Sequence, residues 1–221
     1  TDAEMLEYIN SAETDEERQS RYLNALYAQW SNTLLQEAYE PGSVFKIITL
    51  SIALEENIVN LDSQFYCPGY VTVSDRKISC WKTAGHGSQT LAKALQNSCN
   101  VAFINIGQRI GHSTYYSYFQ AFGFTEKTGI DLTGESTPVA GVHYHTYSIF
   151  SSPLYGGDVT LATYSFGQTF KITPIQLITA VSSVVNGGYL MQPYVVSAYA
   201  DLNGNITESF SPTVVRQVIS Q

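Results

Sequence analysis

Hydrophobic and polar positions divide the chain into a polar beginning and a largely apolar middle. Residues 1–20 are acidic and polar, and we expect an exposed, partly helical approach segment there. A helix is predicted from about residue 15 to residue 32. Its apolar side chains fall on one stripe, which favours core packing over a ligand site. The stripe consists of Leu23, Leu26, Tyr27 and Trp30.

The apolar run that follows predicts the central helix of the chain. From Val44 to Leu54 nearly every position is apolar, so a helix from Ser43 to about Glu56 should be buried on most sides. The Pro41-Gly42 pair predicts a turn directly before it.

Later stretches predict shorter elements. Residues 66–81 form a hairpin that turns near Ser74-Asp75, and residues 193–210 form another around Asn203-Gly204. Helices are expected near residues 90–96, 101–110 and 113–122. Thr173 and Gln176 make a capping box for a further helix that ends near residue 186, and a last helix is predicted to begin at Val214. Residues 133–158 form a long irregular connection.

Composition narrows the class of protein. The chain has 221 residues, of which 44% are hydrophobic and 14% are charged, as in a folded globular domain. Its net charge of −8 argues against nucleic acid as a partner. The sequence has no run of membrane-spanning length and no signal peptide. It begins at Thr1, so we expect it to be part of a longer protein.

Cysteine and histidine positions predict no metal site. Cys67 and Cys80 flank the first hairpin, and a disulfide between them and two free thiols are both open alternatives. The spacing of these residues and Cys99 is not that of a zinc site. His86 is expected in a surface loop, and His143 and His145 in an aromatic loop, because ligating histidines normally come in larger clusters.

The start of the central helix carries the candidate chemistry. Ser43 falls in the first turn, and Lys46 lies one turn later on the same face. A buried lysine has a depressed pKa and can act as a base, so this pair is a candidate activated nucleophile. The structural alternative is a capping serine beside a lysine that reaches solvent.

Several stretches together resemble one enzyme family. Residues 39–46 resemble the first motif, S-x-x-K, of class B penicillin-binding proteins, which are D,D-transpeptidases. Residues 98–100 resemble their S-x-N motif, and residues 128–135 their T-G-I-D-L-x-G-E segment. Residues 165–168, 173–177 and 186–188 resemble the stretch leading into and along the next helix. The hairpin from Phe65 to Lys82 is most similar to sporulation-type members. This ordered set covers roughly residues 30–221.

The resemblance implies a mechanism and assigns roles to residues. Ser43 would attack the penultimate D-alanine of a peptidoglycan stem peptide, with neutral Lys46 as base. Ser98 would relay a proton to the leaving group, and Asn100 would bind the substrate amide, although an ordinary inter-helix turn also favours both residue types. Phe166 and Gln168 would bind substrate. β-Lactams would acylate the serine, and no cofactor is implied.

The resemblance also predicts what this stretch lacks. The family's third motif is K-T-G, but Lys127-Thr128-Gly129 follows a helix within the T-G-I-D-L segment, so we expect it to be structural. The true motif would then follow residue 221. The predicted fold is α+β and mostly helical: the helical subdomain of a D,D-transpeptidase-like fold with small hairpins and little of the central five-stranded sheet. Within a partial domain at 1–221, residues 1–33 are the approach segment and helix. Residues 34–190 are the helical subdomain, and residues 191–221 the hairpin and last helix.

These expectations leave more than one function open. A transpeptidase at the outer face of a bacterial membrane, anchored by a segment outside this chain and working with other cell-wall synthesis proteins, is the leading hypothesis. A carboxypeptidase or β-lactamase-like hydrolase on the same scaffold is the second. A penicillin sensor that binds without turnover is the non-enzymatic alternative.

Overall fold

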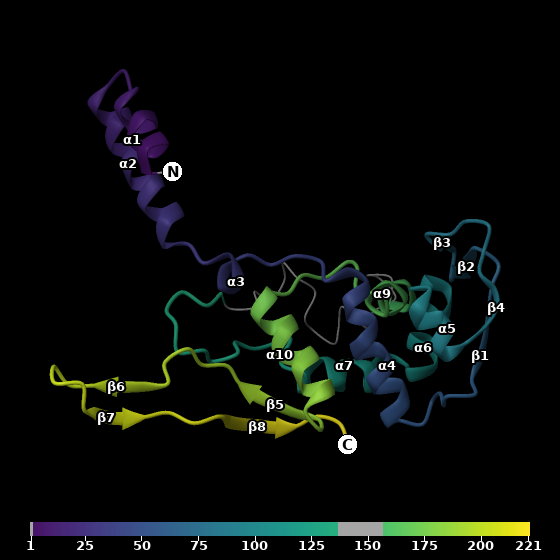
Figure 1. The fold of residues 1–221 in the computed structure, drawn as a ribbon. Coiled ribbons are helices and arrows are strands. Elements are labelled where there is room, and N and C mark those ends of the chain that lie inside the picture. The colour runs from purple at the N-terminus through teal and green to yellow at the C-terminus, as the bar shows by residue number, and fades with distance from the viewer. Residues whose placement is uncertain (1, 137–156) are drawn as a thin grey trace.

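The computed structural model describes residues 2–136 and 157–221, and its body is a packed group of helices with small strand pairs at its edges (Figure 1). Two helices, α1 (Asp2–Asn10) and α2 (Asp15–Trp30), pack on each other and project from this body. The predicted helix at 15–32 is thus confirmed. No helix in either described range is long and apolar enough to cross a membrane.

The central helix is confirmed and begins with a tighter turn. A 3-10 turn, η1 (Gly42–Phe45), leads directly into α4 (Lys46–Glu55). Helix α6 (Asn100–Ile110) packs against α4, and α9 (Gly157–Tyr164) packs against α6. Helix α10 (Pro174–Val185) contacts α4 and has the predicted capping box. The body is completed by three shorter helices: α3 (Thr33–Gln36), α5 (Leu91–Gln96) and α7 (His112–Ala121).

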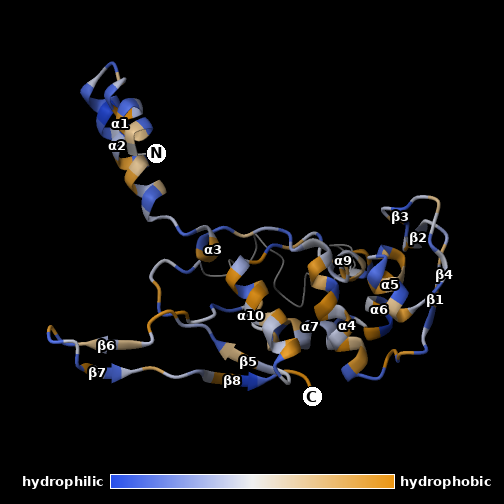
Figure 2. Ribbon diagram, viewed as in Figure 1, coloured by the Kyte–Doolittle hydropathy of each residue, from blue (hydrophilic) through white to orange (hydrophobic). Residues whose placement is uncertain are grey.

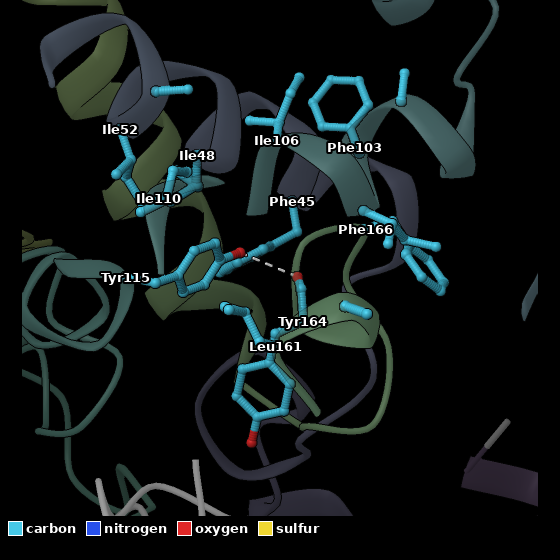
Figure 3. Close-up of a cluster of buried hydrophobic side chains, with 14 of the residues drawn as sticks. Phe45, Ile48, Ile52, Phe103, Ile106, Ile110, Tyr115, Leu161, Tyr164 and Phe166 are labelled. Atoms are coloured by element: carbon cyan, nitrogen blue, oxygen red, sulfur yellow. Dashed lines mark hydrogen bonds between the residues drawn. The ribbon is translucent and has the colours of Figure 1, made fainter. Parts of the chain in front are cut away.

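The core lies between these helices (Figure 3). Phe45, directly before α4, is fully buried, and its ring centroid lies 4.7 Å from that of Phe170. A buried polar network crosses the same region. Thr49 donates to the carbonyl of Ser165 at 3.0 Å, and Tyr115 donates to the carbonyl of Tyr164 at 3.1 Å. These bonds fix the end of α9 against α4 and against the helix that contains Tyr115.

Strands pair only two by two among the described residues, and every pair is antiparallel. The first hairpin is confirmed as β2 (Tyr70–Val73) with β3 (Arg76–Ser79), and beside it β1 (Gln64–Cys67) pairs with β4 (Gly87–Thr90). The second is confirmed as β6 (Ala198–Ala200) with β7 (Ile206–Ser209). The predicted fold class, helical with small hairpins, therefore holds.

Two predictions were wrong. The segment from Val214 is not a helix but strand β8 (Thr213–Gln217), which pairs with β5 (Tyr189–Gln192). Its β-branched residues suit a pleated strand, and β5 offers a free edge. The α2 stripe is not core: α2 has no buried residue, and Trp30 is 67% exposed. Figure 2 shows hydrophobic segments on this arm, away from the body.

The predicted irregular connection at 133–158, with His143 and His145, lies mostly outside the described residues.

Candidate active site

The 3-10 turn places an exposed hydroxyl above a buried amine. Ser43 is exposed, whereas Lys46, one turn later, is only 1% exposed. The lysine Nζ donates to the Ser43 Oγ at 3.0 Å. The predicted pair is therefore close enough for direct proton transfer, and the lysine does not reach solvent as the structural alternative required.

Lys46 is desolvated, and this changes its acidity. Burial lowers the pKa of Lys46 from 10.5 to about 8, while the nearby sulfurs of Cys80 and Cys99 act weakly in the other direction. The rings of Phe103 and Phe166 lie 5.7 and 6.0 Å from Nζ. A lysine in such surroundings is partly neutral near pH 7 and has a lone pair available to accept a proton.

The turn between α5 and α6 supplies the other polar groups. Lys46 Nζ lies within hydrogen-bond distance of three more oxygen atoms: the Ser98 Oγ at 2.8 Å, the Ser98 carbonyl at 3.1 Å and the Asn100 Oδ1 at 2.8 Å. The Ser98 hydroxyl in turn donates to the Ser43 Oγ at 2.9 Å. Ser98 has a φ of 47°, a left-handed conformation that directs both its carbonyl and its hydroxyl at the lysine. The predicted approach of Ser98 and Asn100 to the pair is confirmed.

The stretch at 165–168 lies along the turn before Ser43. Gly42 N donates to the Gly167 carbonyl at 2.9 Å, and a Cβ on Gly167 would lie 1.9 Å from the Gly42 carbonyl oxygen. Only glycine permits this approach. Gln168 is exposed and stays a proposed substrate contact, whereas Phe166 is buried and faces Lys46, which favours a supporting role.

Lys127-Thr128-Gly129 lies in a loop and not on a strand. The Glu135 carboxylate accepts from the Thr128 N and Oγ1, both at 2.7 Å, and from the Gly129 N at 3.1 Å. The Gly129 carbonyl accepts from Gln192 at 2.6 Å. These bonds close a turn and leave the threonine hydroxyl occupied, as the structural interpretation of this sequence predicts.

The structure decides between the two alternatives that the sequence left open for Cys67 and Cys80. All three are buried free thiols, so the Cys67–Cys80 disulfide is not formed. The ligand atoms of Cys67, Cys80, His86 and Cys99 all lie within 4.8 Å of one another, so spacing along the chain was a poor guide. His86 is half-buried rather than a surface residue. Burial raises the pKa of the Cys99 thiol to about 12.

Sequence reasoning missed the contact between Gly42 and Gly167 and the gathering of three thiols with one imidazole. A glycine inside the 165–168 motif was the available signal for the first. The second depends on the pairing of β1 with β4, which no local pattern shows.

Comparisons with known proteins identify the family of this chain. The model of the family described as "Penicillin binding protein transpeptidase domain" matches residues 2–221. The chain therefore belongs to the penicillin-binding protein transpeptidase family.

Relatives within that family are similar over most of this chain. Stage V sporulation protein D of Bacillus subtilis is 43% identical over 192 residues, which cover 86% of this chain and 28% of that protein. This similarity confirms the resemblance to sporulation-type members. The peptidoglycan D,D-transpeptidase MrdA of Haemophilus influenzae is 26% identical over 193 residues, covering 86% of this chain and 29% of that protein.

Solved structures share the fold. A peptidoglycan synthetase from Bifidobacterium adolescentis superposes with a TM-score of 0.74 at 25% identity, covering 95% of this chain and 35% of that one. The D,D-transpeptidase domain of a peptidoglycan glycosyltransferase from Eggerthella lenta superposes with a TM-score of 0.72 at 26% identity, covering 90% and 51%. The chain thus spans between 28% and 51% of the length of these relatives.

Proposed function

We propose that the complete protein is a serine-type D,D-transpeptidase that cross-links peptidoglycan stem peptides through an acyl-serine on Ser43. One observation carries the proposal: the nearly fully buried amine of Lys46 lies within hydrogen-bond distance of both the Ser43 and Ser98 hydroxyls. The family supports the reaction class, and the residues provide the chemistry.

In the first step Ser43 Oγ attacks the carbonyl of the penultimate D-alanine. Neutral Lys46 takes the hydroxyl proton as the C–O bond forms, and the peptide C–N bond then breaks. The proton reaches the departing amine of the terminal D-alanine through Ser98, whose hydroxyl bridges Lys46 and Ser43.

In the second step the amine of another stem peptide attacks the acyl-serine. The same proton path runs in reverse, and Ser43 is released as the new peptide bond forms. Asn100 holds Lys46 through its Oδ1, which leaves its amide NH₂ group to bind the substrate. A β-lactam would acylate Ser43 by the same first step and remain attached.

The proposal includes a location. Cell-wall synthesis by this family takes place outside the cytoplasm, so we place the complete protein at the outer face of the cell membrane, held by a segment outside this chain. Other cell-wall synthesis proteins are its expected partners.

Partitioning of the acyl-enzyme tests the reaction. The complete protein would receive a D-alanine thioester donor with and without a D-amino acid acceptor, and chromatography would measure transfer and hydrolysis products. We expect transfer to exceed hydrolysis and both to vanish in Ser43→Ala. Hydrolysis alone would indicate a carboxypeptidase, and a stable acyl-enzyme without product would indicate a sensor; either result contradicts the proposal.

A further inference from the structure

Three thiols and one imidazole meet beside the active-site turn, and the proposed reaction uses none of them. Cys67 ends β1, Cys80 follows β3, His86 lies in the loop before β4, and Cys99 directly precedes α6. The ligand atoms of the four side chains all lie within 4.8 Å of one another, and the Cys80 Sγ is 3.6 Å from the His86 Nδ1.

The separation of the Cys80 Sγ and the His86 Nδ1 is close to an edge of a zinc coordination tetrahedron, and the other separations exceed such an edge by at most about 1 Å. Zinc bonds of about 2.3 Å to sulfur and about 2.0 Å to nitrogen give S···N edges of about 3.5 Å and S···S edges of about 3.8 Å. Small shifts of the side chains would bring all four atoms to these separations. Three cysteines and one histidine are also a common ligand set of structural zinc sites.

The backbone around the cluster is fixed by close contacts. Cys67 pairs with Gly87 across β1 and β4, and Cys80 N donates to the Gly69 carbonyl at 2.8 Å. A Cβ on Gly69 would lie 1.9 Å from the Thr83 carbonyl oxygen, and one on Gly85 would lie 2.3 Å from that of Cys67. The two loops are therefore in backbone contact, and the fold itself brings the four side chains together.

His86 lacks the partners that a buried imidazole normally has. Its Nδ1 faces the Cys80 sulfur, and its Nε2 is buried without a hydrogen-bond partner among the described residues. An ion bound to Nδ1 would replace this contact with the Cys80 sulfur by a metal–nitrogen bond.

We propose that the sulfurs of Cys67, Cys80 and Cys99 and the Nδ1 of His86 bind one Zn²⁺ ion. Four protein ligands leave no open coordination position, so the site is structural.

The ion joins the hairpin to the start of α6, where Ser98 and Asn100 flank Cys99. Trp81, next to Cys80, already donates to the Asn97 carbonyl at 3.0 Å, so the hairpin contacts this turn at a second point. If the proposed transpeptidase function holds, the ion also positions the two residues that contact Lys46.

Cobalt absorption tests the site independently of enzymatic activity. The complete protein, fully reduced and freed of metal, would be titrated with Co²⁺ and then with Zn²⁺. We expect one equivalent of Co²⁺ to give intense visible bands of a tetrahedral ion and a near-ultraviolet thiolate band, and one equivalent of Zn²⁺ to abolish both. His86→Gln and Cys99→Ser should lose these bands. His112→Gln, which alters a histidine outside the cluster, should keep them.

Folding and redox state are controlled in the same samples. Circular dichroism checks each variant, and His86→Gln, which leaves all thiols in place, decides the outcome if Cys99→Ser does not fold. Alkylation and intact-mass measurement count the free thiols, because a disulfide between any two cysteines would remove two ligands. Protein with three reactive thiols that takes up no Co²⁺ would overturn the proposal, as would a cobalt spectrum unchanged in folded His86→Gln.

Chelation tests the positioning role separately. Removal of the ion should lower the melting temperature and slow β-lactam acylation of Ser43, and added Zn²⁺ should restore both. A cobalt site with no effect of chelation on acylation would overturn the positioning role alone. An absent cobalt site with normal acylation would overturn the metal site and leave the transpeptidase proposal intact.

Discussion

The acidity of Lys46 sets the pH dependence of acylation. Burial lowers its pKa from 10.5 to about 8. That shift corresponds to a cost of about 3 kcal/mol for keeping the charged form in the folded protein. With a pKa of about 8, about one tenth of the lysine is neutral at pH 7 and about half at pH 8. A solvent-exposed lysine would be neutral in only about 3 molecules in ten thousand at pH 7, so burial provides roughly 300-fold more base.

The rate of acylation should follow the neutral fraction. Stopped-flow measurement with a fluorescent penicillin between pH 6 and 9, at constant ionic strength, gives the second-order rate constant. We expect it to rise about tenfold from pH 6 to pH 7, about fivefold from pH 7 to pH 8 and less than twofold from pH 8 to pH 9, because only the unprotonated amine can accept the Ser43 proton. Lys46→Arg should be slow at every pH, because a guanidinium group remains protonated.

Two results would refute this reasoning. A rate that is constant from pH 6 to 9 would show that Lys46 does not titrate in the acylation step. A Lys46→Arg variant with the wild-type rate would show that the base is another group. Ser98→Ala serves as a second control: its rate should fall while the midpoint stays near that of the wild-type protein, since the lysine keeps its burial.

Two further predictions concern the segments around this pair. Gly167→Ala should slow acylation by about a hundredfold, because its Cβ would lie 1.9 Å from the Gly42 carbonyl oxygen and displace the turn that carries Ser43. Gly204→Ala is the matched control: the φ of Gly204 is 84°, against 85° for Gly167, but no atom lies within 4 Å of its Cβ. This variant should carry only the backbone strain of a left-handed alanine and keep the wild-type acylation rate. Equal acylation rates for the two variants would contradict this account. Thr128→Val should retain acylation by fluorescent penicillin while losing its hydrogen bond to Glu135, with a fall in melting temperature as the readout. Loss of labelling in a folded Thr128→Val protein would instead make Lys127-Thr128-Gly129 part of the catalytic site.

The sequence predicted helix starts and contacts well where the interacting residues lie within one helical turn of each other. Thr173, Pro174 and Gln176 satisfy the first turn of α10 by themselves, so the start of that helix follows from four consecutive residues. The contact of Lys46 with Ser43 also follows from helix geometry alone. Its contacts with Ser98 and Asn100 were predicted only through the family resemblance, because they join residues more than fifty positions apart.

The incorrect predictions share a physical cause, which is dependence on a distant partner. The segment at Val214 has an apolar pattern that suits either a helix or a strand, and pairing with β5 decides between them. The stripe on α2 is amphipathic, yet Leu23, Tyr27 and Trp30 remain exposed, because α1 is the main element that packs on that helix among the described residues. The gathering of Cys67, Cys80, His86 and Cys99, which sequence reasoning missed, has the same cause, because the strand pairing that brings them together is long-range.

Mass spectrometry of the penicillin adduct tests the central claim, that Ser43 is a nucleophile activated by Lys46. The complete protein would be incubated with benzylpenicillin, and intact mass followed by peptide mapping would count and locate the adduct. We predict one penicilloyl group per chain, on the Ser43 hydroxyl, with no adduct on Ser43→Ala and a greatly slowed one on Lys46→Arg. An adduct on another residue, or an unchanged adduct on folded Ser43→Ala, would contradict the account.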